Sequence, residues 1–388
     1  MLYQISGLGI VMLMLGIATL RRNPLYSPLV ISSFSWLIVF FAGIFFHNQF
    51  YSLSDHAFIA WLIWFLITST FYFLLAPVVG RYKQSPRRKL PVDYSLFMAI
   101  LIVWLVYRVW VVGNSGPEHF FLNLRLSSNG LEGFEPLGLV GRFYPVSFSL
   151  FLFEHVYTHP SNRRQRIMCW IWMLAYAVAT MGKFAVLTPV LAWVVIQGVQ
   201  GRLPVKKLVL LGCGTFFLMM AAHFVRSGSA DGGTTILDVL AVYIYSPIVA
   251  LGYMDIPSAH QWGSHVFRFL YAVGSSLGIL SEPVDVILPY VNVPRLTNVY
   301  TVMQPFYHDF SLTGVAIGAV GYGVFFSVLF FFACRGRGFF LVLYSGLAIA
   351  LFGQFIGELF FTMFSGNLQF FLVLLFIFAI SKKEKNVC

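Results

Sequence analysis

A polar stretch between residues 298 and 314 carries the side chains best suited to chemistry. It reads Asn298-Val299-Tyr300-Thr301 and then Tyr307-His308-Asp309-Phe310, close before a long apolar run. A histidine beside a carboxylate can remove a proton from a hydroxyl group such as that of a sugar. Asp309 has a structural alternative, as the cap of the helix that follows. We predict that His308 and Asp309 are catalytic and that Asn298, Tyr300 and Tyr307 bind substrate.

Glu358 is a further candidate base in the apolar stretch that follows. Gln354 and Glu358 are four residues apart, so a helix would place them on one face. Gly353 and Gly357 interleave with them at a spacing that allows close helix packing. A buried glutamate can have a raised pKa and accept a proton at neutral pH. The alternative for Glu358 is an ion pair with a nearby cation.

These residues stand in a chain that is otherwise almost continuously apolar. Of the 388 residues, 59% are hydrophobic and only 10% are charged, which is typical of polytopic membrane proteins. Stretches of about 18–23 residues separate the charge clusters, enough to cross ~30 Å of hydrocarbon as helices. We therefore predict an all-α protein that forms a single integral membrane domain over residues 1–388, with no soluble domain.

We predict about 11 transmembrane helices. They are Leu2–Leu20, Leu25–Phe46, His56–Val79, Asp93–Val112, Leu137–Tyr157, Ile167–Met181, Phe184–Val199, Leu208–Val225, Leu312–Ala333, Phe339–Phe360 and Gly366–Ile380. A re-entrant hairpin is the alternative for the pair that meets at Gly182. Before the last three helices lies a large segment, residues 226–312. Its two apolar stretches, Ile236–Tyr253 and His265–Leu280, are predicted to lie in the membrane interface, and if both cross, the count becomes about 13.

Charge distribution orients these helices. The chain has 25 lysines and arginines, and most of them fall in alternate loops, which the positive-inside rule places in the cytoplasm. The N-terminus is then outside, the C-terminus is in the cytoplasm, and residues 226–312 begin and end outside. Met1–Leu20 lacks a basic start and precedes Arg21 and Arg22, so we expect a retained helix rather than a cleaved signal.

The cations that break this pattern lie at or near the outer face. They are Arg108, Arg125, Arg142, Lys183, Arg226, Arg268 and Arg295. Arginine forks match phosphate oxygens and lysine supplies a point charge, so we predict an anion site, which would suit the diphosphate of a lipid carrier. Salt bridges to acids of the outer loops are the alternative, and for Arg108 we expect snorkelling or packing.

The sequence lacks the patterns of several other functions. It has no Asp-x-Asp pair, no clustered cysteines and histidines, and no P-loop, so we expect no nucleotide cofactor and no obligatory metal. No basic run is interleaved with aromatic residues, which excludes a nucleic-acid site. Trp262, between His260 and His265, is similar to a sugar-stacking surface, and membrane anchoring is the alternative.

Short strings along the chain resemble the Wzy-type polymerases of bacterial O-antigen, which are oligosaccharide repeat-unit polymerases. They are Phe120-Phe121-Leu122-Asn123-Leu124-Arg125, Met181-Gly182-Lys183-Phe184, and Asn298-Val299-Tyr300-Thr301 followed by Tyr307-His308-Asp309-Phe310 and Gly314. The many helices and the large outer segment near the C-terminus add to the resemblance. Ser311 stands where the family commonly has glycine.

The resemblance implies a GT-C-like glycosyltransferase of the bacterial inner membrane that works at the periplasmic face. A lipid-linked acceptor repeat unit would attack the growing glycan, and undecaprenyl diphosphate would leave. The outer cations would hold the diphosphates, and His308, Asp309 or Glu358 would be the base. A chain-length regulator is an implied partner.

Other functions stay open. They are an O-antigen ligase, a flippase of lipid-linked sugars, and a non-catalytic member of an export complex. A transporter is expected to place charges near the midplane of the bilayer, whereas several helices here have none in their centres.

Overall fold

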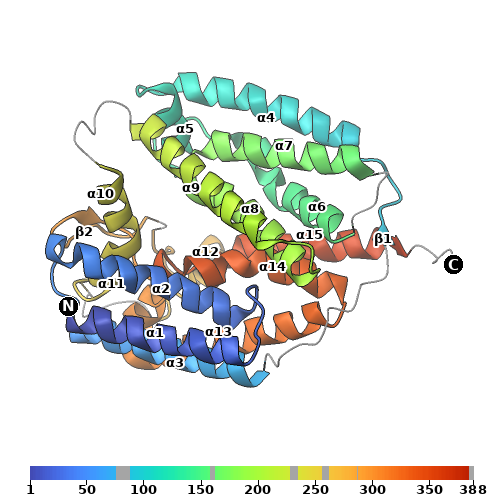
Figure 1. Ribbon diagram of the computed structural model, residues 1–388. Coiled ribbons are helices and arrows are strands. Elements are labelled where there is room, and N and C mark those ends of the chain that lie inside the picture. Colours follow the sequence, from blue (N-terminus) through green and yellow to red (C-terminus); the bar gives the residue numbers. More distant parts are fainter. Residues whose placement is uncertain (76–87, 158–161, 228–234, 256–261, 286, 384–388) are drawn as a thin grey trace. The chain divides into compact units, whose positions relative to one another are not determined.

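The computed structural model describes residues 1–75, 88–157, 162–227, 235–255, 262–285 and 287–383, and these residues are mostly helical (Figure 1). The chain forms two compact units. Unit 1 comprises Met1–Arg81, Thr234–Phe332 and Ala350–Asn367. Unit 2 comprises Tyr82–Gly233, Ala333–Ile349 and Leu368–Cys388. That the whole chain forms a single membrane domain stays a prediction.

Unit 1 is built on α1 (Leu2–Leu20), α2 (Pro28–Phe46), α3 (Asp55–Leu75) and most of α13 (Gln304–Cys334). Helices α1 and α2 lie side by side because Gly7 lets the ring of Phe40 approach: a Cβ at Gly7 would lie 2.5 Å from that ring. Trp61 of α3 then packs edge-on against Phe40, with ring centroids 4.4 Å apart. Fully buried aromatic side chains therefore form the core of this unit.

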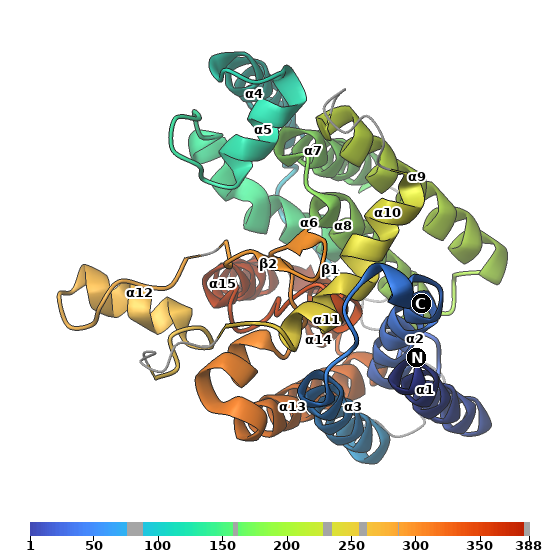
Figure 2. The same ribbon diagram turned by 90° about the vertical axis from the view of Figure 1, so that its left-hand side faces the viewer.

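The segment between α3 and α13 in unit 1 is only partly helical. It contains α10 (Ile236–Leu240), a π-helical turn, α11 (Ser246–Leu251), α12 (Arg268–Ser276), and the antiparallel two-residue strands β2 (Val291–Asn292) and β3 (Leu296–Thr297). Helix α12 has nine residues, so it rises about 14 Å and does not cross a bilayer by itself. Figure 2 shows α12 well separated from α1.

Helix α13 begins at Gln304, but its backbone breaks at Phe310 and Ser311, so its long apolar stretch starts about where the predicted helix Leu312–Ala333 does. Ser311 has φ +56°, a conformation that favours glycine and here ends the first helical stretch. Gly314 allows the turn to close, because a Cβ there would lie 2.3 Å from the carbonyl oxygen of Phe306. The prediction missed the short helix from Gln304 because its sequence is polar.

Helix α14 (Gly338–Phe352) is shorter than predicted, and a 3-10 turn over Gly353–Phe355 follows it. The expectation that Gln354 and Glu358 share a helix face is therefore wrong. The Gln354 carbonyl accepts a hydrogen bond from the Val302 amide at 2.7 Å, which replaces a helical bond. The backbone and side chain of Gln354 form hydrogen bonds with other segments, and these bonds end the helix although the sequence of this stretch is apolar.

Unit 2 is also helical. It contains α4 (Ser95–Ser115), α5 (Phe120–Ser128), a 3-10 turn (Gly138–Phe143), α6 (Tyr144–Val156), α7 (Arg163–Thr180), α8 (Lys183–Val199) and α9 (Val205–Ser227), together with most of α14 and of α15 (Phe364–Ile380). Figure 1 shows α4 and α7 side by side. Strands β1 (Arg88–Lys89) and β4 (Lys382–Lys383) pair antiparallel.

Two predictions for unit 2 are wrong. No helix was predicted between Asp93–Val112 and Leu137–Tyr157, yet the polar stretch Asn114–Pro136 that joins them holds α5. The Asn123 side chain closes this turn by donating to the carbonyls of Gly113 and Glu118, at 2.9 and 2.7 Å. Helix α6 begins at Tyr144 instead of Leu137, since the glycines of the preceding stretch favour a 3-10 turn.

Among the described residues, six helices are long and apolar enough to cross a membrane: α1, α2 with its 3-10 extension to Gln49, α3, α4, α13, and α14 with its extension to Phe355. Shorter apolar helical stretches add Lys183–Val199, Leu210–Val225, Ile236–Leu251 and Phe364–Ile380. This composition is that of a polytopic membrane protein.

Candidate functional site

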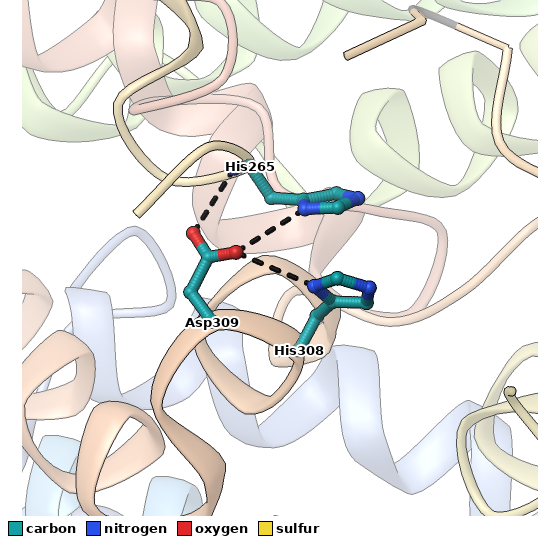
Figure 3. A group of neighbouring side chains, drawn as sticks. All are labelled: His265, His308 and Asp309. Carbon is teal, nitrogen blue, oxygen red and sulfur yellow. Dashed lines mark hydrogen bonds and ion pairs between the residues drawn. The ribbon is translucent and has the colours of Figure 1, made fainter. Parts of the chain in front are cut away.

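Asp309, His308 and His265 form one cluster in unit 1 (Figure 3). Asp309 and His308 come from the short helical stretch of α13 before its break, and His265 comes from the turn that precedes α12. One ligand-capable atom from each residue lies within 4.8 Å of the others. The cluster therefore joins two parts of the chain that are far apart in sequence.

The carboxylate of Asp309 is held on both of its oxygens. Oδ2 accepts hydrogen bonds from the backbone amides of His265 and Val266, at 3.0 and 2.9 Å. Oδ1 lies 3.2 Å from Nδ1 of His265 and 3.4 Å from Nδ1 of His308. The side chain of Asp309 is 0% exposed. Asp309 thus fixes the 265–266 turn.

The two imidazole rings lie close together, with centroids 3.8 Å apart. Figure 3 shows that both rings turn their Nδ1 edge toward Asp309 and their opposite edge in a common direction. When Nδ1 carries the proton that faces the carboxylate, Nε2 is the basic atom of the ring. This arrangement of carboxylate and imidazole is that of a general base with an orienting partner.

An exposed aromatic side chain borders the cluster. Trp262 is 71% exposed, and its ring packs edge-on against Phe310 at 5.1 Å between centroids. Gly263 has φ +69°, and a Cβ there would lie 2.7 Å from the ring of Phe267, so this turn requires glycine. Trp262 is therefore presented three residues before His265, as a stacking surface for a sugar requires. His260 lies outside the described residues.

Glu358 lies in a different setting. Its carboxylate accepts hydrogen bonds from the Tyr322 hydroxyl and from the amides of Phe360 and Thr362, the amide contacts at 2.8 and 2.5 Å. The residue is buried. These donors hold the chain reversal after α14, so the contacts of Glu358 are those of a structural carboxylate, and its catalytic role stays a prediction.

Two predicted phosphate ligands of unit 1 already contact protein groups. The guanidinium of Arg295 pairs with Asp238 at 2.5 Å. Hydrogen bonds from Thr235, and then from Arg295, lower the pKa of the Asp238 carboxyl to about 2. Arg268 donates from Nε to the carbonyl of Val284 at 2.7 Å. A guanidinium has five N–H donors, so each arginine keeps further donors for an anion.

The predicted substrate-binding residues near the cluster differ in exposure. Tyr300 is 4% exposed and its hydroxyl donates to the Pro289 carbonyl at 2.8 Å. Burial raises the pKa of this phenol. Asn298 and Tyr307 are half-buried. Tyr300 therefore anchors the segment that leads into α13, and Asn298 and Tyr307 are the more accessible pair.

The remaining predicted cations belong to unit 2. Arg125 lies in the last turn of α5, and the neighbouring Ser128 donates to the Thr180 carbonyl at 3.0 Å. This bond joins α5 to the turn that begins α8 at Lys183. Arg142 is exposed at the end of a 3-10 turn. Arg226 lies in the last turn of α9, and its side chain is not among the described ones.

Arg108, for which snorkelling or packing was expected, forms a salt bridge to an acid of the polar stretch instead. It pairs with Glu135 at 2.7 Å and donates to the carbonyl of Pro136 at 2.6 Å. Both partners belong to the polar stretch after α5. Arg108 therefore holds that stretch on α4.

Sequence reasoning did not include His265 among the catalytic residues. It lies 44 residues before Asp309, with no regular spacing that connects the two. The available signal was local: a histidine that follows Trp262-Gly263 in a polar turn of the outer segment. That signal indicated a sugar surface and gave no partner for the imidazole.

A curated relative bears on the class of protein. An O-antigen polymerase of Shigella dysenteriae is 25% identical to this chain over 226 residues, which cover 55% of this chain and 56% of that protein. The chain thus spans about half the length of that relative. No family model matches the chain, and no solved structure matches it.

Proposed function

We propose that the protein is a membrane glycosyltransferase that polymerises lipid-linked oligosaccharide repeat units into O-antigen or a related polysaccharide. The His265–His308–Asp309 cluster carries the proposal, because it combines a base and its orienting carboxylate beside the exposed ring of Trp262. Similarity to the O-antigen polymerase of Shigella dysenteriae supports the same class of reaction.

In the proposed reaction, a sugar hydroxyl of the acceptor repeat unit attacks the anomeric carbon of the donor's reducing-end sugar. One imidazole accepts the hydroxyl proton at Nε2, while Asp309 holds Nδ1–H and stabilises the resulting positive charge. A new glycosidic bond forms, the bond from the anomeric carbon to the diphosphate oxygen breaks, and undecaprenyl diphosphate leaves. The glycan is then one repeat unit longer.

The outer cations stabilise the leaving diphosphate in this proposal. Arg268 and Arg295 in unit 1, and Arg125, Arg142, Lys183 and Arg226 in unit 2, are the candidates. Arginine contributes most where its fork meets two phosphate oxygens as negative charge develops on them. Arg295 is the first to test because its partner Asp238 is known, which allows the structural role to be separated from binding.

The proposal includes a location. A GT-C-like arrangement of about 11 crossings in the bacterial inner membrane, with a periplasmic N-terminus and a cytoplasmic C-terminus, places residues 226–312 at the periplasmic face. Lipid-linked repeat units reach that face after flipping. A separate membrane protein that regulates chain length is a proposed partner.

The test is deletion of the gene in its host, followed by gel analysis of the surface polysaccharide. We expect the deletion strain to make core capped by a single repeat unit, because flipping and ligation remain intact. Wild-type protein restores the ladder, and His308→Ala at equal expression does not. His56→Ala, which removes an exposed histidine of the same unit, is the matched control and restores it.

Two other patterns contradict the proposal. Polymer that accumulates on the lipid carrier and never reaches the core identifies a ligase. Absence of any repeat unit at the outer face identifies a flippase.

A further inference from the structure

We propose that His265, His308 and Asp309 bind a divalent transition-metal ion, with Zn²⁺ the best fit, through Nδ1 of each histidine and Oδ1 of the aspartate. The proposal concerns the same residues as the proposed function and would replace its base step, because an imidazole that binds an ion through Nδ1 carries its proton on Nε2. The test separates the two. It revises the expectation of a metal-independent protein, which followed from the absence of a ligand motif in the sequence.

The separations within the cluster suit metal ligands and are long for charge-assisted hydrogen bonds. Oδ1 of Asp309 lies 3.2 and 3.4 Å from the two Nδ1 atoms. A charge-assisted N–H···O⁻ bond is about 2.7–2.9 Å long. Ligand atoms about 2.0–2.1 Å from a tetrahedral Zn²⁺ lie about 3.3 Å from one another. The observed pair of distances matches the second value.

The carboxylate is also preorganised as a metal ligand. Backbone amides of His265 and Val266 satisfy Oδ2, so the carboxylate has a fixed orientation and presents Oδ1 to both imidazoles. Ligating carboxylates in metal sites are commonly held by such hydrogen bonds. The turn that supplies these amides is the same turn that supplies His265, so one local conformation positions two of the three ligands.

Charge balance points the same way. The Asp309 side chain is 0% exposed and those of His265 and His308 are 13% and 8% exposed. With neutral imidazoles the three residues carry one negative charge in a buried position, which a divalent ion would stabilise. A divalent ion supplies the opposite charge and lies between the three donors.

The donor set selects the class of ion. Two imidazole nitrogens and one carboxylate oxygen suit Zn²⁺ and related first-row ions, whereas Ca²⁺ and Mg²⁺ prefer oxygen ligands. Three protein ligands leave a coordination position for water or substrate, as in catalytic rather than structural zinc sites. An ion held there supplies Lewis-acid chemistry for a phosphate or sugar oxygen.

The test is metal binding to the full-length protein in detergent. Elemental analysis and Zn²⁺ titration are made on the wild type, His265→Ala, His265→Cys and the control His56→Ala. We expect one ion per chain in the wild type and in His56→Ala. We expect at least a tenfold loss of affinity in His265→Ala and its recovery in His265→Cys, because a thiolate also binds zinc.

Recovery by cysteine separates ligation from folding, since both substitutions remove the imidazole. Thermal unfolding without metal checks that the two variants have similar stability. Wild type that binds no Zn²⁺, or binds it equally in His265→Ala, overturns the metal site and leaves the base mechanism intact. Wild type that binds Zn²⁺ while His308→Ala still produces full ladders upholds the metal site and overturns the proposed function.

Discussion

Oδ1 of Asp309 lies 3.2 Å from Nδ1 of His265, a residue 44 positions earlier in the chain. The contact fastens the turn before α12 to the first turns of α13. It brings together a carboxylate that accepts two backbone amides and two imidazoles that face it from the other side.

Replacing Asp309 with asparagine should reduce the rate of polymerisation by about 10²–10⁴-fold, the range for loss of an efficient acid–base group. One carboxylate oxygen becomes an amide donor, so either the 265–266 amides or the two imidazoles lose their acceptor. The rate is measured with purified protein and lipid-linked repeat units. Asp255→Asn, at an exposed carboxylate of the same segment, should keep the wild-type rate. Equal rates for the two variants would exclude Asp309 from the mechanism.

Trp262→Ala should raise the KM for the lipid-linked glycan by roughly tenfold with a smaller change in kcat, a loss at the lower end of the about 1–3 kcal/mol that a nucleic-acid base gains by stacking on an aromatic side chain. The ring is 71% exposed, so its removal leaves the fold intact. Trp262→Phe keeps an aromatic face and should restore most of the affinity. Steady-state kinetics decide the matter: a loss of kcat at unchanged KM contradicts a stacking role.

How well the sequence predicts the structure depends on whether a feature is determined by local sequence or by contacts between distant segments. Apolar runs such as Leu2–Leu20 predict helices well because their composition and length leave few alternatives in a membrane protein. The start of α13 at Gln304 and the end of α14 at Phe352 were missed, since hydrogen bonds between distant segments determine them. His265 was missed as a partner for the same reason.

The candidate site also combines features that local sequence predicts with features that it does not. His308 and Asp309 are adjacent in sequence, and their residue types alone indicated acid–base chemistry. The orientation of Asp309 depends on amides 43 and 44 residues away, which no local pattern reveals. Arg295 and Asp238, 57 residues apart, are a further pair of this kind.

Ser311→Gly should stabilise the protein by about 1 kcal/mol, because Ser311 has φ +56° and ψ −151°, a region that costs an L-residue roughly 1–3 kcal/mol. Glycine is common at this position in the Wzy-type polymerases that the sequence resembles. The free energy of unfolding in detergent measures the change. Ser327→Gly, at a buried helical position of α13, is the control and should destabilise by about 1 kcal/mol. If both substitutions change the free energy of unfolding in the same direction, Ser311 is not strained.

Gln354→Leu should destabilise unit 1 by about 3 kcal/mol, since each buried donor left without an acceptor costs about 1–3 kcal/mol. Oε1 of Gln354 accepts from the ring N–H groups of Trp36 and Trp64 at 2.8 and 3.2 Å, and from the hydroxyl of Ser32 at 3.1 Å. Thermal unfolding measures the loss. Gln49→Leu, at an exposed glutamine, should have little effect, and equal stability of both variants contradicts the role of Gln354 as an acceptor.

Arg295 and Asp238 can be separated by single substitutions. Arg295→Ala removes the ion pair alone, whereas Asp238→Asn also weakens the contacts of this carboxylate with Thr235, so its loss of stability should be at least as large. A phosphate-binding role predicts that only Arg295→Ala also raises the KM for the lipid-linked substrate, because Asp238→Asn leaves the guanidinium available. Binding of the substrate at several salt concentrations measures the electrostatic part, which should weaken in Arg295→Ala. An equal rise of KM in both variants assigns Arg295 a structural role alone.

The pH dependence of this pair follows from the pKa of Asp238, lowered to about 2. A carboxyl whose folded pKa lies below its unfolded pKa of about 3.9 adds stability that is complete above the unfolded value. That contribution falls only as the pH drops from about 4 through 2. Unfolding measured between pH 5 and pH 8 should therefore show the same difference between wild type and Asp238→Asn throughout. A difference that changes across this range contradicts the ion pair as its source.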